Sequence, residues 1–428
     1  MVIPPVIIGK MISFVSQRLN IGTGETWPGE VALKFDKDIL SSFTSKLKRG
    51  VILIAGTNGK TTTSLMIKRV LEKKGFRVIH NESGANLLNG LVSSFIKKTG
   101  WRGTIKADFA VLEVDENSLP IILDSFTPKV LIMLNLFRDQ LDRYGEVDVI
   151  ADKWQKALNK IAGDTTIIVN ADDPLIAHLG RLSRAKILYF GLEEPKSFQK
   201  NLEHATDSIF CLNCGHRLSY KGIYFSHLGL WHCQKCGSKR PKVNLSTWDS
   251  VLPGLYNRYN TLAGVAALKS LGISEKEIKQ GLKDFIPAFG RQEEIEIQGK
   301  KIKIFLAKNP TGFNETLKTV ISLGGKQLLI VLNDQIPDGR DVSWIWDVDF
   351  EMLPSFINPV VSGDRAYDLA VRLKYSRPAQ TPIIIYENLS RALDFCIHHV
   401  NQKDPLYILA TYSAMLEVRK ILSGRKIL

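Results

Sequence analysis

The sequence of 428 residues lacks the features that mark membrane-spanning, secreted and repetitive proteins. No stretch reaches the roughly 18 uncharged apolar residues that a membrane-spanning helix needs. The first residues carry no basic segment leading into a long apolar run and a small-residue cleavage site, which argues against a secretory signal. There is no internal repeat and no low-complexity tract. We therefore expect a cytoplasmic, globular protein of two to three domains.

Cysteine is scarce, with only five in the whole chain. Four of them form two Cys-x-x-Cys pairs, and Cys396 stands alone. This usage favours a reducing compartment and a bound metal over a disulfide framework.

Acidic residues are outnumbered by basic ones. Lys and Arg total 57 against 43 Asp and Glu, so the formal net charge is +14. Such a balance suits polyanionic partners, namely nucleotide phosphates, a pyrophosphate-bearing substrate, an anionic membrane surface or nucleic acid. Charge alone does not choose among them.

Short β-branched runs alternate with longer amphipathic stretches on both sides of Gly290, which predicts an α/β fold with mostly parallel sheets. Between about 207 and 243 this rhythm breaks into short pieces rich in Gly, His, Cys and aromatic residues. We expect an N-terminal segment (1–50) that packs on a central ATP-binding domain (51–290, with the insertion 207–243), and a C-terminal α/β domain (291–428).

A phosphate-binding loop is the most informative motif. The buried strand Val51 to Ile54 leads into Gly-Thr-Asn-Gly-Lys-Thr, and a helix follows. In this geometry backbone N–H groups and a helix N-terminus hold phosphate oxygens. Lys60 would contact the outer phosphates, and Thr61 would hold Mg²⁺. The predicted ATP contacts of the loop are Gly56, Thr57, Asn58, Gly59, Lys60, Thr61 and Thr62.

The loop departs from the generic pattern because Ile54 stands where a glycine is expected. It resembles instead the loop of Mur ligases and folylpolyglutamate synthases, and other segments follow in Mur-ligase order. These segments are Ala110 to Glu113, Asn135 to Gly145, Asn170 to Pro174, Leu252 to Asn260 and Phe289 to Arg291. The resemblance implies a Mur-ligase-type central domain and a Rossmann-like C-terminal domain.

The same resemblance assigns roles to single residues. It implies that Glu113 binds Mg²⁺ with Thr61, with Asp115 and Glu116 as neighbours that could share the task. It also implies that Asn257 lies against the nucleotide and that Arg291 contacts ATP.

Two positions leave the metal contacts open. Gln140 stands where the family keeps a histidine that contacts a second metal. Lys153 lies near the place where many Mur ligases carbamylate a lysine to bridge metals, and it reads equally well as a solvated helix lysine.

The insertion carries a C-x₂-C-x₁₈-C-x₂-C array, whose four thiolates can meet tetrahedrally around a structural Zn²⁺. The predicted zinc ligands are Cys211, Cys214, Cys233 and Cys236. All four positions are filled by protein, so no coordination site is left for hydrolysis. We expect His216, His227 and His232 to lie on the surface of this ribbon.

Two departures from ordinary Mur ligases narrow the resemblance. Only about fifty residues precede the loop, and the family motif Asp-Tyr-Ala-His-Asn-Pro appears as Phe305 to Pro310 without its Asp and His. With the Cys₄ insertion and the aspartate-rich segment Asp338 to Asp349, the chain resembles the MurT family of lipid II isoglutaminyl synthases. These act with a GatD-like glutamine amidotransferase.

That resemblance implies an ATP-dependent carbon–nitrogen ligase of peptidoglycan biosynthesis. ATP would turn the α-carboxyl of D-glutamate in the lipid II stem peptide into an acyl phosphate, and ammonia would convert it to D-isoglutamine. Lys60 and Glu113 would stabilise the transferring phosphoryl group. The lipid substrate would bring the protein to the inner face of the membrane.

In the family, an aspartate is thought to complete a Cys-His pair of the amidotransferase. We favour Asp341 for this role, followed by Asp347 and Asp349, and a solvated acidic loop is the structural alternative. Cys396 lies in an amphipathic helix and is expected to be buried and inert, so the amidase must be another chain. Trp344 and Trp346 suit either an interface or the core.

Two other functions remain open at this point. A folylpolyglutamate-type ligase would add an amino acid instead of ammonia. A zinc-ribbon ATPase would bind nucleic acid, which the net charge allows, although the ribbon has no dense Lys/Arg stripe.

Overall fold

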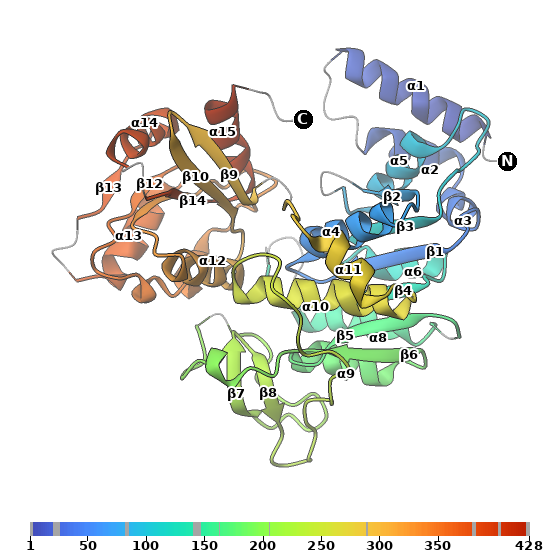
Figure 1. Ribbon diagram of the computed structural model, residues 1–428, viewed down its shortest axis with the longest axis horizontal. Helices are drawn as coiled ribbons and strands as arrows, with labels where there is room; N and C mark the ends of the chain where they lie inside the picture. The colour runs from blue at the N-terminus through green and yellow to red at the C-terminus, as the bar shows by residue number, and fades with distance from the viewer. Residues whose placement is uncertain are drawn as a thin grey trace.

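The computed structural model describes residues 3–19, 26–81, 85–139, 147–161, 163–204, 206–287, 290–378, 382–400 and 404–424. They form two six-stranded sheets, each covered by helices on both faces, and a small two-stranded ribbon (Figure 1). The predicted α/β class, with a Cys₄ insertion inside the first of two α/β units, is thus confirmed.

All strands of the first sheet are parallel. In spatial order they are β2 (Val78–His80), β3 (Phe109–Val114), β1 (Gly50–Ala55), β4 (Val130–Met133), β5 (Thr166–Asn170) and β6 (Lys186–Phe190). Side chains alternate along a strand, so Leu53 and Ala55 of β1 enter one core and Ile52 and Ile54 the other. A strand buried on both faces reads as a continuous apolar run, which is how β1 appears in the sequence.

Two groups of helices cover this sheet. One face carries α5 (Leu88–Lys98), α6 (Leu119–Ser125), α8 (Val147–Leu158) and α9 (Pro174–Leu182). The other carries α4 (Lys60–Lys73), α10 (Leu255–Ser270) and α11 (Glu275–Leu282).

In the described part of the chain three helices precede the first strand, in the segment for which we predicted packing on the central domain but no secondary structure. They are α1 (Ile3–Leu19), α2 (Trp27–Phe35) and α3 (Ile39–Thr44). Phe43 of α3 stacks on Phe95 of α5 with 5.4 Å between ring centroids, and a Cβ at Gly29 of α2 would lie 1.9 Å from the Asn89 carbonyl oxygen. The segment is therefore fixed on α5. No helix in the described part of the chain combines the length and apolar character needed to cross a bilayer.

The second sheet is parallel except for one edge strand. Its order is β13 (Ile384–Ile385), β12 (Val360–Ser362), β11 (Gln327–Val331), β14 (Leu406–Ala410), β10 (Lys300–Leu306) and the antiparallel β9 (Arg291–Ile297). One face packs on α12 (Pro310–Ser322), α13 (Ala366–Ser376) and the 3₁₀ turns η3 (Ser343–Asp347) and η4 (Phe350–Met352). The other packs on α14 (Leu389–His399) and α15 (Tyr412–Ser423).

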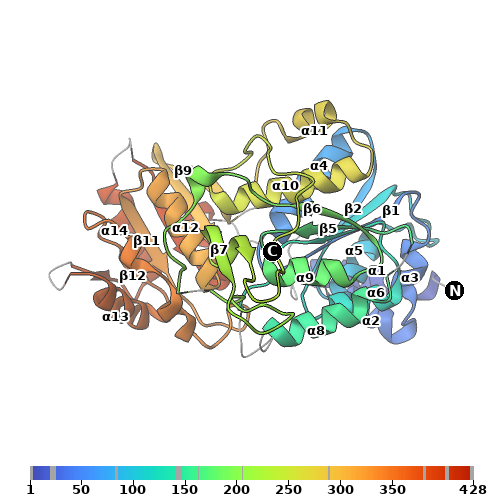
Figure 2. The ribbon, with the colours of Figure 1, turned by 90° about the horizontal axis from the view of Figure 1, so that it is seen from below.

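The ribbon consists of β7 (Ser219–Phe225) and β8 (Leu228–His232), which follow the turn η2 (Pro195–Ser197). Trp231 of β8 donates from its indole Nε1 to the Ala171 carbonyl at 3.0 Å, which joins the ribbon to the first sheet. Seen from below, β7 lies in front of the junction between the two sheets (Figure 2). The insertion therefore stands beside both halves.

Candidate active site

The phosphate loop lies at the carboxyl end of β1, where it meets β3. These strands are parallel neighbours and Ile54 pairs with Glu113, so the end of β3 lies beside the loop. Thr61, in the first turn of α4, donates its hydroxyl to Glu113 Oε2 at 2.7 Å. The structure thus brings together the two residues predicted to hold Mg²⁺.

Two glycines are required by the path of this loop. Gly59 has φ +93° and a Cβ there would lie 2.0 Å from Asn260 Oδ1 of α10, while Gly56 has φ +140° and a Cβ would lie 2.9 Å from the Asn135 carbonyl oxygen. Only glycine adopts this backbone without strain and leaves room for these neighbours. Asn135 also clamps the loop, accepting from Asn58 N–H at 2.9 Å and donating to the Asn58 carbonyl at 3.1 Å.

Lys60 is almost fully buried. Its ammonium donates to the carbonyls of Gly56 and Thr57 and forms an ion pair with Glu116 at 3.1 Å. The ammonium therefore lies folded over the loop that would hold the phosphates. Glu116, named from the sequence as a neighbour of the metal site, is the partner of Lys60.

One carboxylate oxygen of Glu113 makes no hydrogen bond to the described residues. Burial raises the pKa of its carboxyl, and neither the Thr61 hydrogen bond nor the nearby Lys60 charge cancels this rise. Its Oε1 is buried and has no hydrogen-bond partner among the described residues. An uncompensated buried carboxylate oxygen is costly, and together with the Thr61 hydroxyl it forms an oxygen pair of the kind that Mg²⁺ prefers. These residues fit the metal.

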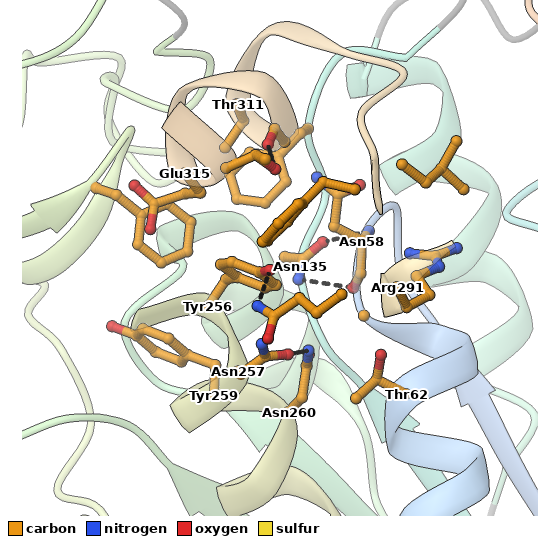
Figure 3. A pocket seen from close by; sticks show the side chains of 18 of the residues that line it. Asn58, Thr62, Asn135, Tyr256, Asn257, Tyr259, Asn260, Arg291, Thr311 and Glu315 are labelled. Atoms are coloured by element: carbon orange, nitrogen blue, oxygen red, sulfur yellow. Dashed lines mark hydrogen bonds between the residues drawn. The ribbon is translucent and has the colours of Figure 1, made fainter. Parts of the chain in front are cut away.

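A cavity opens next to the loop, between α10 and α12 (Figure 3). Asn257, predicted to lie against the nucleotide, lines it and donates to the Pro253 carbonyl at 2.7 Å. Arg291, predicted to contact ATP, lines it from the start of β9. Thr62 also lines the cavity. The loop and these two residues thus share one site.

Several lining residues were not predicted. Tyr256 is the neighbour of Asn257, and its hydroxyl accepts from the Gln292 amide at 2.6 Å. Burial raises the pKa of Tyr256 to about 12, so it stays neutral. Glu315 of α12 lines the opposite wall. Tyr256, Gln292 and Glu315 lie within or close to segments that resemble family motifs. This closeness to a motif is the only signal in the sequence that could have identified them.

Residues at the start of α12 reach across to the loop. The side-chain amides of Asn309 and Asn58 exchange hydrogen bonds of 3.2 and 3.3 Å, and Asn309 also caps α12 by accepting from Gly312 N–H. Lys308 forms an ion pair with Asp139 of the first sheet. Burial alone would lower the pKa of Lys308, but the carboxylates of Asp139 and Glu116 together outweigh it and the pKa is raised. This segment, altered from the Mur motif, therefore docks the second sheet on the first.

A buried charge cluster lies behind the cavity wall. Lys318 of α12 donates to Glu315 at 2.9 Å and forms an ion pair with Glu203, which comes from the segment leading into the ribbon. Burial, with the nearby Glu203 charge, raises the pKa of Glu315 to about 7 despite Lys318. Glu315 therefore titrates in the physiological range.

We expect the melting temperature of a Glu315→Gln variant to rise relative to the wild type as the pH increases. A carboxyl with a raised pKa stabilises the fold fully below its unfolded pKa, and this is lost as the pH rises through about 7. The wild type loses at most about 3 kcal/mol of unfolding free energy in this way, whereas the glutamine variant does not titrate and loses none. Melting both proteins between about pH 5 and about pH 8 measures this. Glu296→Gln, at an exposed position of β9, is the control, and a pH-independent difference for Glu315→Gln would contradict the assignment.

The four predicted zinc ligands converge. Their sulfur atoms all lie within 4.8 Å of one another, and the closest pairs, Cys211 with Cys236 and Cys214 with Cys233, are 3.5 Å apart. Tetrahedral zinc thiolate ligands with bonds of about 2.3 Å place sulfurs about 3.8 Å apart. Each pair ends in a left-handed glycine, at Gly215 and Gly237. The donor set fits a structural zinc ion.

We expect the double variant Cys211→Ser/Cys233→Ser to bind no zinc and to melt roughly 10 °C below the wild type, because metal affinity and folding are coupled in such sites. Metal analysis and thermal melting measure the two effects. Cys396→Ser is the control, since it removes a thiol outside the cluster and should keep one zinc per chain. Retention of zinc by the double variant would show that these thiolates do not hold it.

The three histidines of the insertion differ from one another. His216 is exposed and His232 half-buried, but His227 is fully buried, so the prediction of a surface position was wrong for it. His227 Nε2 lies 3.4 Å from Asp173 Oδ2, and its ring lies 5.0 Å from that of Phe137. The turn between β7 and β8 points inward to the first sheet, which explains the burial.

The structure separates the three candidate aspartates. Asp349 accepts from the Asn314 amide at 2.7 Å and forms an ion pair with His204. Asp347 lies 3.5 Å from Arg138 of the first half.

Asp341 differs from both. It is exposed, and hydrogen bonds from Ser343 lower the pKa of its carboxyl. It lines an open surface depression that includes Trp346, which is half-exposed. Trp344 instead packs on Phe313 in the core, at 6.0 Å between ring centroids.

Two further residues have plain surroundings. Lys153 is exposed on α8 and donates to Asn117 Oδ1 at 3.0 Å. Cys396 is buried in α14, and burial raises its pKa to about 12, so it is no nucleophile. Gln140, which replaces the family histidine, lies outside the described residues.

Comparison with known proteins shows the family to which the chain belongs. The family model for the Mur ligase middle domain matches residues 54–268, and that for the MurT ligase C-terminal domain matches residues 306–415. The MurT subunit of lipid II isoglutaminyl synthase (glutamine-hydrolyzing) from Streptococcus pneumoniae is 35% identical, over 98% of this chain and 96% of that one. The chain belongs to the MurT family. The MurT subunit from Staphylococcus aureus is also 35% identical, over 86% of each chain.

Solved structures agree with MurT membership at the level of the fold. A pseudomurein peptide ligase type C from Methanothermus fervidus has a TM-score of 0.68 at 22% identity and covers 90% of this chain and 80% of its own. The MurF ligase from Thermotoga maritima in complex with ADP has a TM-score of 0.63 at 16% identity, with coverages of 92% and 84%. Both share the Mur-ligase fold with this MurT-family chain.

Proposed function

We propose that the chain is the synthetase subunit of a lipid II isoglutaminyl synthase. It uses ATP to amidate the α-carboxyl of D-glutamate in the lipid II stem peptide, giving D-isoglutamine during peptidoglycan biosynthesis. The main support is the hydrogen bond that joins Thr61 of the phosphate loop to Glu113, which assembles a site for ATP and Mg²⁺. This site lies in a chain that is 35% identical, over almost its full length, to a MurT subunit of lipid II isoglutaminyl synthase. The word subunit in that name also supports a partner, which we take to be a GatD-like glutamine amidotransferase.

The proposed reaction has two steps. A carboxylate oxygen attacks the γ-phosphorus of ATP and ADP leaves, which gives an acyl phosphate. Ammonia then attacks the acyl carbon, inorganic phosphate leaves and a proton is lost. The first step turns a poor leaving group into a good one.

Residues of the loop account for the first step. The backbone N–H groups from Gly59 to Thr61 hold phosphate oxygens, whereas the Asn58 N–H is already bonded to Asn135 Oδ1. Lys60 stabilises the charge that develops on the transferring phosphoryl group. Mg²⁺, held by Thr61 and Glu113, would neutralise charge on the same oxygens. Asn257 and Arg291 bind the rest of ATP in the adjoining cavity. This is mostly electrostatic catalysis in a preorganised site.

The nitrogen comes from a second chain. A glutamine amidase of this type needs a nucleophilic cysteine, and Cys396 is buried while the other four cysteines form one cluster. We assign to Asp341 the role of orienting a histidine of the partner. Its exposure supports this choice, whereas Asp347 and Asp349 already form ion pairs within the chain.

The test combines the purified chain, its partner, ATP, Mg²⁺ and lipid II with ammonium, glutamine or free amino acids. Mass spectrometry of the stem peptide should show an amide with ammonium and with glutamine. Incorporation of an amino acid would instead establish the folylpolyglutamate-type reaction. ATP hydrolysis stimulated by DNA or RNA would establish the nucleic-acid-binding function.

Because the substrate is lipid-linked, we propose that the reaction takes place at the inner face of the membrane.

A further inference from the structure

The first helix of the chain is fixed with one face turned outward. Val6 and Gly9 of α1 are buried against α2 and α5. A Cβ at Gly9 would lie 2.9 Å from Ile96 Cδ1 and 3.3 Å from the Pro28 carbonyl oxygen. This close crossing fixes the rotation of α1 about its axis, so its opposite face points away from the protein. Figure 1 shows α1 at the outer edge of the molecule.

That outward face is apolar. Ile7, Met11 and Phe14 are 36%, 57% and 61% exposed. Their spacing of four and three residues places them on one stripe along the helix. A helix that is apolar on both faces normally buries both. Helix α1 buries only one, and the other exposes an apolar stripe to water.

An exposed tryptophan and several basic residues lie on α1 and in the segment that ends α5, against which α1 packs. Trp101, in the turn after α5, is 60% exposed, and Lys10 of α1 lies over its ring at 5.5 Å from the centroid. Among the side chains that the structure describes, the half-buried or exposed cations of α1 and of the segment around this turn are Lys10, Lys97, Lys98, Arg102 and Lys106. Neither α1 nor the segment from Leu88 to Ala107 contains an Asp or Glu. The surface is thus both apolar and cationic.

We propose that this α1 surface, formed by the stripe, Trp101 and the basic residues around them, rests on an anionic lipid bilayer. An apolar helix stripe with flanking Lys, Arg and Trp is the arrangement that inserts into the headgroup boundary. The charge complements anionic lipids and opposes a second copy of the chain, which would present the same positive surface. The biological role of this contact rests on the proposed function, because the contact would hold the enzyme where its lipid-linked substrate lies. The contact itself needs no substrate.

Vesicle sedimentation of the full chain, with no lipid II present, tests the proposal. The wild type should sediment with vesicles of phosphatidylglycerol and phosphatidylcholine, less so at high salt, and not with phosphatidylcholine alone. Met11→Ser/Phe14→Ser and Lys97→Glu/Lys98→Glu/Arg102→Glu should each lower the partition coefficient about tenfold or more, since one basic residue near an anionic surface contributes about fivefold.

Two matched variants serve as controls. Ile336→Ser/Phe356→Ser removes apolar side chains that are 79% and 69% exposed on the other half of the molecule. Lys196→Glu/Lys242→Glu/Lys276→Glu reverses the same number of exposed charges elsewhere. Both should bind vesicles like the wild type, and all variants should keep its melting temperature and ATP hydrolysis.

Three results would overturn the proposal: no binding of the wild type, an equal loss in the controls, or binding only when lipid II is in the vesicles. Self-association that the Met11→Ser/Phe14→Ser variant abolishes, without vesicle binding, would assign the surface to a second copy instead. Amidation of a water-soluble, short-chain lipid II analogue separates the two proposals. The α1 variants should amidate it normally, and a wild type that binds vesicles but does not amidate it would refute only the proposed function.

Discussion

Replacing Lys60 with alanine is expected to lower amide formation roughly 10²–10³-fold, which is the usual cost of removing one group that stabilises transition-state charge. The loss should be the same with ammonium and with glutamine, because Lys60 acts on phosphoryl transfer, before any nitrogen arrives. Steady-state rates with both nitrogen sources, at saturating ATP and lipid II, measure it. Lys60 lies folded over the loop carbonyls, so the variant removes the ammonium without removing the loop.

The variant also leaves Glu116 buried without its partner, which can destabilise the fold. A Lys60→Ala/Glu116→Gln double variant removes the pair as a whole, and its melting temperature separates folding from catalysis. Lys276→Ala, at an exposed position of α11, is the control. If a well-folded Lys60→Ala variant kept the wild-type rate, the loop would not be the catalytic phosphate site.

Replacing Asp341 with asparagine is expected to have a larger but selective effect. Glutamine-driven amidation should fall roughly 10³–10⁴-fold, the scale seen when a histidine loses its orienting aspartate, while free ammonium still supports the wild-type rate. The reason is geometric: Asp341 lies on the surface, whereas the loop and Glu113 lie at the carboxyl end of the first sheet. Rates of the reconstituted complex with either nitrogen source measure the ratio.

Asp368→Asn is the matched control, because Asp368 lines the same surface depression and is half of an ion pair with Arg365. It should keep glutamine-driven activity. If Asp341→Asn lowered both activities equally, Asp341 would belong to the ligase site or to the fold. A selective loss in Asp347→Asn or Asp349→Asn would move the role to that residue and show that its ion pair opens in the complex.

Local motifs account for what could be predicted from the sequence. The phosphate loop and the two cysteine pairs are each short, and their glycines and spacing are dictated by backbone geometry that any sequence must satisfy. Glu113 required one more step, because the hydroxyl of Thr61 meets it only through the pairing of β1 with β3. That step came from the resemblance to Mur ligases, because the pairing of these two strands was not predicted from the sequence.

Contacts between distant segments could not be predicted. Glu315 looks like any helix glutamate in the sequence, with Lys318 one turn further along. Only the fold buries this pair beside Glu203, which lies more than a hundred positions earlier in the chain. Asp341 and Asp349 read alike for the same reason, since what separates them is the ion pair of Asp349 with His204.

Helix α1 shows a different limit. Its apolar residues fall on both faces, so they give no clear helical period, and the close crossing at Gly9 depends on α2 and α5.

The ion pairs between the two halves also bear on how fast the protein can turn over. Among the described residues these pairs are Asp139–Lys308, Glu203–Lys318, His204–Asp349 and Arg138–Asp347. An outward rotation of the second sheet, which would let ADP leave the cavity, has to break all of them together. Ion pairs at a partly exposed junction weaken as salt screens them. We therefore expect higher ionic strength to speed product release, a step in which the phosphate loop takes no chemical part.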